Sequence, residues 1–119
     1  MANRLRGEIE AMLDGRRFTL VLTLGALAEL EAAFGADDLS ALAERFAAGR
    51  LSAGDITRLI GAGLRGAGNE VSDDQVAAMT ATGGAAGFAA IAADLLLATF
   101  GGGEEADEQR EGRDAPKDP

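Results

Sequence analysis

The chain has 119 residues, which is enough for a single apolar core but not for two. Its formal net charge is −9, which disfavours nucleic acid and membranes as partners, because proteins that bind phosphate backbones or anionic headgroups generally carry basic patches. His and Cys are both absent, which removes the commonest acid–base catalyst, thiolate nucleophiles, disulfides and the commonest metal ligands. The composition therefore disfavours an enzyme, and we expect neither a cofactor nor a metal.

A β-hairpin is predicted near the N-terminus, over residues 7–23. Asp14-Gly15 is a strong signal for a two-residue type I′ turn, because both positions of that turn need positive φ. The turn pairs the strands so that five apolar side chains share one face: Ile9, Ala11, Leu13, Phe18 and Leu20. Two strands alone are marginally stable in water, so helices must cover this face.

Two helices are predicted directly after the hairpin. The first ends at Gly35, and the second begins at Asp37 or Asp38 and stops at Gly49. Apolar residues recur along both helices at helical spacing, and we expect them to point inward: Leu24, Leu27, Leu30, Phe34, Leu39, Leu42 and Phe46.

Capping boxes mark the next two helices. Ser52 and Asp55 form one such box, with Asp in place of Glu or Gln, and that helix ends near Gly66 or Gly68. Ser72–Gln75 is a full capping box, which opens a short helix. The residues expected to pack inward from these two helices are Ile56, Leu59, Ile60, Leu64, Val76 and Met79.

The last predicted helix follows a break at Gly83-Gly84 and runs from about Ala85 to Phe100. One of its faces carries the apolar residues Phe88, Ile91, Ala92 and Leu95. From Gln75 to Gly103 the only charge is Asp94, so the run is long enough to span a bilayer. Its many Ala and Gly residues and the central Asp nevertheless favour a packed helix.

These elements predict a mostly α (α+β) fold. Residues 1–101 form a single domain, in which the N-terminal hairpin packs on a bundle of four to five helices. Residues 102–119 contain seven acidic and three basic residues and no large apolar residue, which predicts a disordered acidic tail. Met1–Arg6 has basic residues without an apolar stretch behind them, so we expect no signal peptide and a cytoplasmic location.

Gly61–Gly66 matches G-x-G-x-x-G, the dinucleotide-binding fingerprint. That fingerprint works where a strand meets the N-terminus of a helix, whose amides bind the pyrophosphate. Here Ser52 starts a helix well before the glycines, so we interpret them as sites of close helix packing or as a helix end.

Charged residues in the helical region also have plain structural explanations. The pairs Asp37-Asp38 and Asp73-Asp74 stand at predicted helix starts, where a carboxylate caps backbone amides, so we favour capping over catalysis or metal binding. Arg58 and Arg65 lie two turns apart on one helix and share a face. We interpret that face as solvated, the alternative being contact with an acidic stretch of a protein partner.

Leu95-Leu96-Leu97, followed by Phe100, is the strongest predicted interaction site. Three consecutive residues sweep about 200° around a helix, so one core cannot bury them all. Either this helix is central in the bundle, or its second face binds another chain or a second copy of this one. The predicted partner-binding residues are Phe88, Ile91, Leu95, Leu96, Leu97 and Phe100.

The order of these motifs resembles the gene transfer agent tail assembly chaperone family over residues 5–101. The resemblance is carried by the Asp14-Gly15 hairpin, LGALAELE (Leu24–Glu31), GLRGAG (Gly63–Gly68) and GGAAGF (Gly83–Phe88), which leads to Leu95-Leu96 and Phe100-Gly101. It implies a small protein of a siphophage-type tail that binds the tape measure protein and helps to recruit tail tube subunits. It implies no catalytic residues and at most a minor presence in the finished particle.

Two other functions remain open. A permanent structural component of the tail or neck would share the same partners. An acidic regulatory adaptor, such as an antitoxin or anti-activator, would use its negative charge to mimic nucleic acid.

Overall fold

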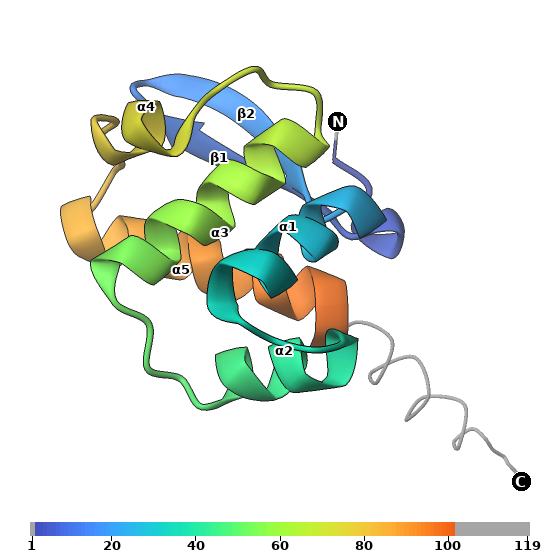
Figure 1. Ribbon diagram of the computed structural model, residues 1–119. Coiled ribbons are helices and arrows are strands. Elements are labelled where there is room, and N and C mark those ends of the chain that lie inside the picture. The colour runs from blue at the N-terminus through green and yellow to red at the C-terminus, as the bar shows by residue number, and fades with distance from the viewer. Residues whose placement is uncertain (1, 102–119) are drawn as a thin grey trace, which may run out of the picture.

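The computed structural model describes residues 2–101, which form a two-stranded hairpin and five α-helices (Figure 1). The elements in chain order are η1 (Arg4–Arg6, a 3-10 turn), β1 (Glu8–Leu13), β2 (Arg16–Val21), α1 (Leu24–Phe34), α2 (Leu39–Ala47), α3 (Ala53–Gly66), α4 (Asp73–Ala77), α5 (Gly84–Leu96) and η2 (Leu97–Gly101, a π-helical turn). The predicted α+β class is confirmed. The predicted acidic tail lies outside the described residues.

The hairpin has the predicted register. Ile9 pairs with Leu20, Ala11 with Phe18 and Leu13 with Arg16. Asp14 and Gly15 have φ values of 54° and 73°, as a type I′ turn requires. On the predicted inner face Phe18 is half-buried, and the other four residues are buried.

Helix ends follow the predicted caps. α1 ends at Gly35, whose φ of 67° is left-handed, and Asp38 caps α2 through the amide of Ala41. Both capping boxes are complete, because Ser52 and Ser72 each exchange hydrogen bonds with the residue three positions on. Local sequence therefore determines where these helices begin.

Two predicted inward residues lie outside instead. Leu24 is 75% exposed and Leu39 is 41% exposed. Each is the first residue of its helix, so it stands at the end of the helix contact and not in its middle. In α1 the buried positions are Ala26, Leu27 and Leu30.

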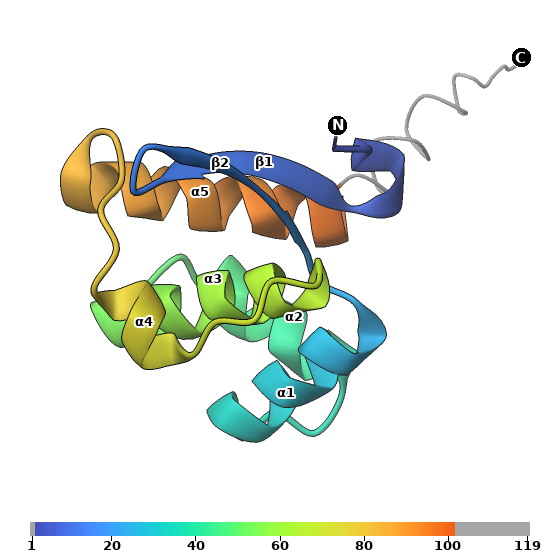
Figure 2. The ribbon, with the colours of Figure 1, turned by 90° about the horizontal axis from the view of Figure 1, so that it is seen from above.

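α3 is the central helix. It contacts α1, β2, α4 and α5, and in Figure 2 the hairpin and α5 lie on one side of it while α1 lies on the other. Its second half is buried without interruption from Leu59 to Leu64. The largest fully buried side chains of the molecule gather around it: Ile9, Leu13, Leu20, Leu30, Leu42, Leu59, Ile60, Leu64 and Leu95.

The G-x-G-x-x-G glycines lie inside α3, where they permit close packing as predicted. A Cβ at Gly63 would stand 2.7 Å from Leu95 Cδ2, and a Cβ at Gly66 would overlap the backbone carbonyl of Val21. At Gly61 it would overlap the carboxylate of Asp73. The glycines thus allow β2, α4 and α5 to approach one helix.

Candidate partner-binding surface

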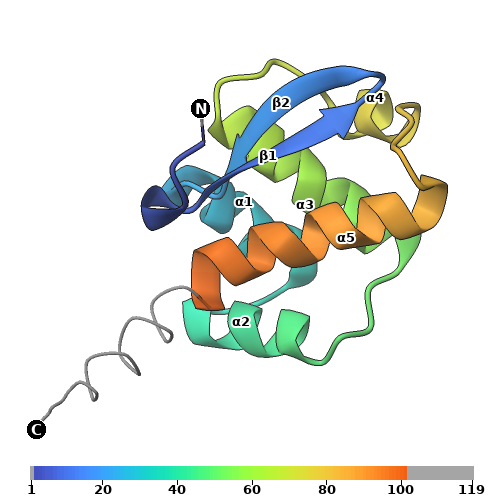
Figure 3. The same cartoon turned by 180° about the vertical axis from the view of Figure 1, so that it is seen from behind.

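α5 and η2 together form a long apolar segment at the surface, which runs across the near face of the molecule in Figure 3. Within Gly84–Gly101 only Ala92 and Leu95 are buried. By length and composition this segment could cross a membrane, a test that core helices of soluble proteins also pass. Its one charged side chain, Asp94, pairs with Arg4 at 3.0 Å. A large apolar surface is therefore left on the outside of the helical bundle.

The predicted partner-binding residues fall into three positions. Leu95 is entirely buried, so its side chain offers no surface to a partner. Phe88 and Ile91 are half-buried against the core. The last three residues, Leu96, Leu97 and Phe100, line a groove at the end of α5, where Leu97 is 48% exposed.

This groove, here named the C-terminal groove, runs between α2 and the α5–η2 segment. It has a volume of about 390 Å³, and all of its lining residues are apolar: Ala43, Phe46, Ala47, Ala93, Leu96, Leu97, Phe100 and Gly101. Gly101 packs directly on Leu97, since a Cβ there would lie 2.6 Å from Leu97 Cδ1. The contribution of α2 to this surface was not predicted from the sequence.

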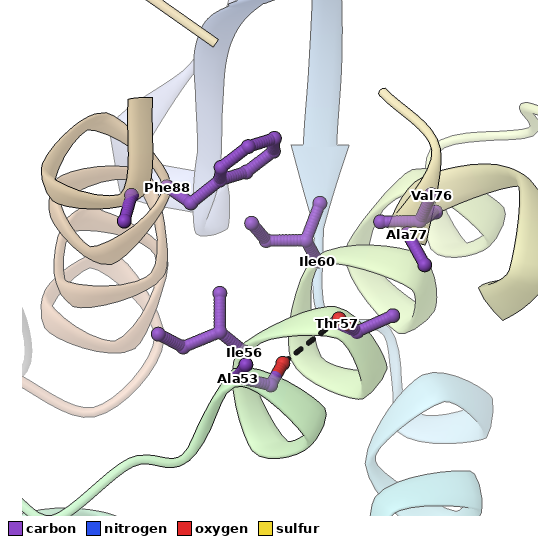
Figure 4. Close-up of a pocket in the computed structure, with 8 residues that line it drawn as sticks. Ala53, Ile56, Thr57, Ile60, Val76, Ala77 and Phe88 are labelled. Atoms are coloured by element: carbon purple, nitrogen blue, oxygen red, sulfur yellow. Dashed lines mark hydrogen bonds between the residues drawn. The ribbon is translucent and has the colours of Figure 1, made fainter. Parts of the chain in front are cut away.

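A second, smaller pocket lies at the other end of α5, where Figure 4 shows the Phe88 ring reaching toward Ile60 of α3. Its volume is about 200 Å³, and it is lined by Ala53, Ile56, Thr57, Ile60, Val76, Ala77, Ala85 and Phe88. The Thr57 hydroxyl donates to the carbonyl of Ala53 at 2.8 Å. The pocket is thus suited to an apolar side chain, and no ionisable residue lines it.

Arg65 is part of an ion-pair network and not of a solvated face. Its guanidinium donates to the Glu29 carboxylate of α1, to Asp73 of α4 at 3.1 Å and to the Val71 carbonyl at 3.0 Å. Asp73 is therefore engaged by Arg65, and Ser72 is the residue that caps α4. Arg58, the other arginine of the predicted face, is exposed. Within residues 2–101, no cluster of acidic side chains is arranged to hold a metal ion.

No curated protein and no solved structure matches the chain significantly. A family described as phage tail tube protein, GTA-gp10, matches residues 6–102, which is well over half of the chain. The match agrees with the expected relation to gene transfer agents and phage tails. Its description names a tail tube protein, however, so it supports a tail protein without specifying a chaperone. The chain therefore belongs to this family of phage tail proteins, described as phage tail tube protein, GTA-gp10.

Proposed function

We propose that the chain is a tail assembly chaperone, which binds the tape measure protein and aids the recruitment of tail tube subunits. The single observation that carries this proposal is the C-terminal groove, an apolar surface that is open to solvent. Large apolar patches on a small domain commonly mark sites where another chain binds. Family membership supplies the context, because it links the chain to tail proteins.

The proposed contact is a helix lying in a groove. A tape measure protein is expected to be a long helical chain, whose apolar stripes would self-associate before a tube encloses them. An amphipathic helix can bury such a stripe against an apolar groove. The C-terminal groove has α2 on one side and the α5–η2 segment on the other, an arrangement suited to a helix of the client chain.

The groove can be tested by placing a charge in it. In Leu97→Asp, the carboxylate would have to be desolvated against the partner, so we expect recovery of the co-expressed tape measure protein to fall about tenfold or more. Leu24→Asp is the matched control, because Leu24 is also an exposed leucine and lies in α1, outside the groove. Equal recovery with both folded variants would exclude this site.

A permanent tail tube subunit is the second candidate, and the description of the family favours it. A tube subunit would be present in purified particles at many copies for each tape measure protein. A chaperone would be absent or present in trace amounts. Quantitative mass spectrometry of purified particles separates the two functions, and a stoichiometric amount of this chain would overturn the chaperone proposal.

A further inference from the structure

The lining of the C-terminal groove indicates the size of the side chains that it accepts. Ala43 and Ala47 on α2 and Ala93 on α5 are small, so between the helices there is room for larger side chains from a partner. Phe46 and Leu96 supply apolar walls around them. Such a site suits a helix that presents Leu, Ile or Phe at i, i+3 or i+4, and i+7.

Charge beside the groove is predominantly negative. Glu44 is exposed on α2, next to the lining residue Ala43. The basic neighbour of Glu44, Arg45, is directed away, because it pairs with Asp55 at 3.5 Å and lies over the ring of Phe34. A basic side chain flanking the stripe of a bound helix would therefore meet a carboxylate on the α2 side.

The chain beyond the groove adds more carboxylates. Residues 102–119 carry four of the nine net negative charges, and this segment continues directly from Gly101 in the groove lining. Glu104 and Glu105 follow Gly101 by three and four residues, so covalent geometry keeps them within about 11 and 14 Å of it. That is comparable with the screening length of about 8 Å at physiological ionic strength, so these charges act on whatever occupies the end of the groove.

We infer that the C-terminal groove binds an amphipathic helix whose apolar stripe is flanked by Lys or Arg, and that the acidic residues after Gly101 strengthen this binding. The inference rests on the proposed function, since the helix would belong to the client chain. The apolar lining provides the contact area, and the surrounding carboxylates select basic flanks over acidic ones.

The test uses the full chain and two designed helical peptides of about 18 residues, which share one leucine stripe and differ only in Lys or Glu flanks. Fluorescence anisotropy gives the Kd at about 50 mM and at about 500 mM NaCl. We expect the Lys peptide to bind about tenfold more tightly at low salt and to lose most of that advantage at high salt. Equal affinity for the two peptides would overturn the selection for basic flanks.

Variants assign the binding to the groove and to the acidic segment. Ala47→Phe fills the groove without adding charge, and Leu97→Gln removes apolar surface, so each should weaken the Lys peptide about tenfold. Ala48→Phe is the matched control, because Ala48 is exposed and does not line the groove. Replacing the acidic residues at 104, 105, 107 and 108 by amides should weaken binding about threefold at low salt only.

Each outcome has a definite reading. If Ala47→Phe and Leu97→Gln fold and bind the Lys peptide like the wild type, the groove is not the site. If the amide variant binds equally well at low salt, the acidic segment has no part in recognition. If tape measure protein still co-purifies while the Lys peptide fails to bind, this inference falls and the proposed function stands.

Discussion

Asp14 links the hairpin turn to the segment that precedes α5. Its carboxylate accepts hydrogen bonds from the amide of Thr80 at 2.8 Å and from the Thr80 hydroxyl at 3.2 Å. Its own amide donates to the Thr80 carbonyl at 2.9 Å. One residue therefore both permits the left-handed turn and connects two parts of the chain that are distant in sequence.

We expect Asp14→Ala to lower the free energy of unfolding by about 1–3 kcal/mol. The substitution removes two hydrogen bonds and places a residue with little tolerance of positive φ in the turn. Asp14→Asn should cost less, because an amide oxygen still accepts from Thr80 and Asn tolerates the left-handed region. Urea denaturation measures both variants, and equal losses would contradict this role of the side chain.

Arg65 connects three helices through a partly buried guanidinium. Burial lowers the pKa of Arg65, but its bonds to Glu29 and Asp73 raise that pKa by more, so the pKa lies above its usual value. The side chain is therefore charged throughout the physiological range. Because its planar fork binds two carboxylates and the Val71 carbonyl at once, an ammonium group cannot reproduce the full set of contacts.

Arg65→Lys should accordingly reduce the free energy of unfolding by about 1 kcal/mol, the partial exposure of the network limiting the loss. Arg58→Lys is the control, since Arg58 lies on the same helix, is exposed and forms no ion pair with any described residue. Denaturant midpoints for the two variants test this, and an unchanged midpoint for Arg65→Lys would show that the charge alone is sufficient.

At the scale of elements, the contact between α3 and α5 depends on a missing side chain. Gly63 lies opposite Leu95 and Leu20, and a methyl group there would be 2.7 Å from the first and 3.2 Å from the second. Both neighbours are fully buried, so they have little room to move. The glycine therefore sets how closely the hairpin and α5 approach the central helix.

Gly63→Ala should destabilise the protein by about 1–3 kcal/mol through overpacking, although alanine is the better helix former. Gly54→Ala is the matched control in the same helix, because its new Cβ would make only ordinary contact with Ser52 Oγ at 3.7 Å. That variant should be neutral or more stable by up to about 1 kcal/mol. Thermal unfolding of both proteins gives the comparison, and a stabilised Gly63→Ala would rule out the packing argument.

Element boundaries were predictable because their signals act over a few residues. The Asp14-Gly15 turn determines the hairpin register, and Ser52 and Ser72 cap the helices that follow them. The exposure of Leu24 and the partners of Arg65 depend on how distant elements pack. Helical periodicity contains no information on that packing.

The candidate surface was predictable only in part, for the same reason. Angular spacing alone implies that Leu95, Leu96 and Leu97 cannot all be buried, and they are respectively buried, half-buried and exposed. The groove also needs Phe46 and its neighbours on α2, which lies about fifty residues earlier in the chain. No local motif indicates that α2 lies beside the end of α5.

At the scale of the whole molecule, net charge opposes the apolar surface. The exposed apolar face of the α5–η2 segment favours self-association, whereas a net charge of −9 makes identical chains repel one another. Both contributions act between any two copies, but only the repulsion is weakened by salt. The oligomeric state should therefore depend on ionic strength.

We expect the full chain to be mainly monomeric at about 50 mM NaCl and to self-associate detectably at about 1 M NaCl, where the screening length falls to about 3 Å. Sedimentation velocity over a range of protein concentrations measures this change. Leu97→Asp should remain monomeric at both salt concentrations, because it places a charge in the C-terminal groove. Leu24→Asp, which adds the same charge outside the groove, should associate like the wild type. If salt had no effect on the wild type, the balance between charge and apolar surface would not govern its association, and if both variants stayed monomeric, the association surface would lie elsewhere than the groove.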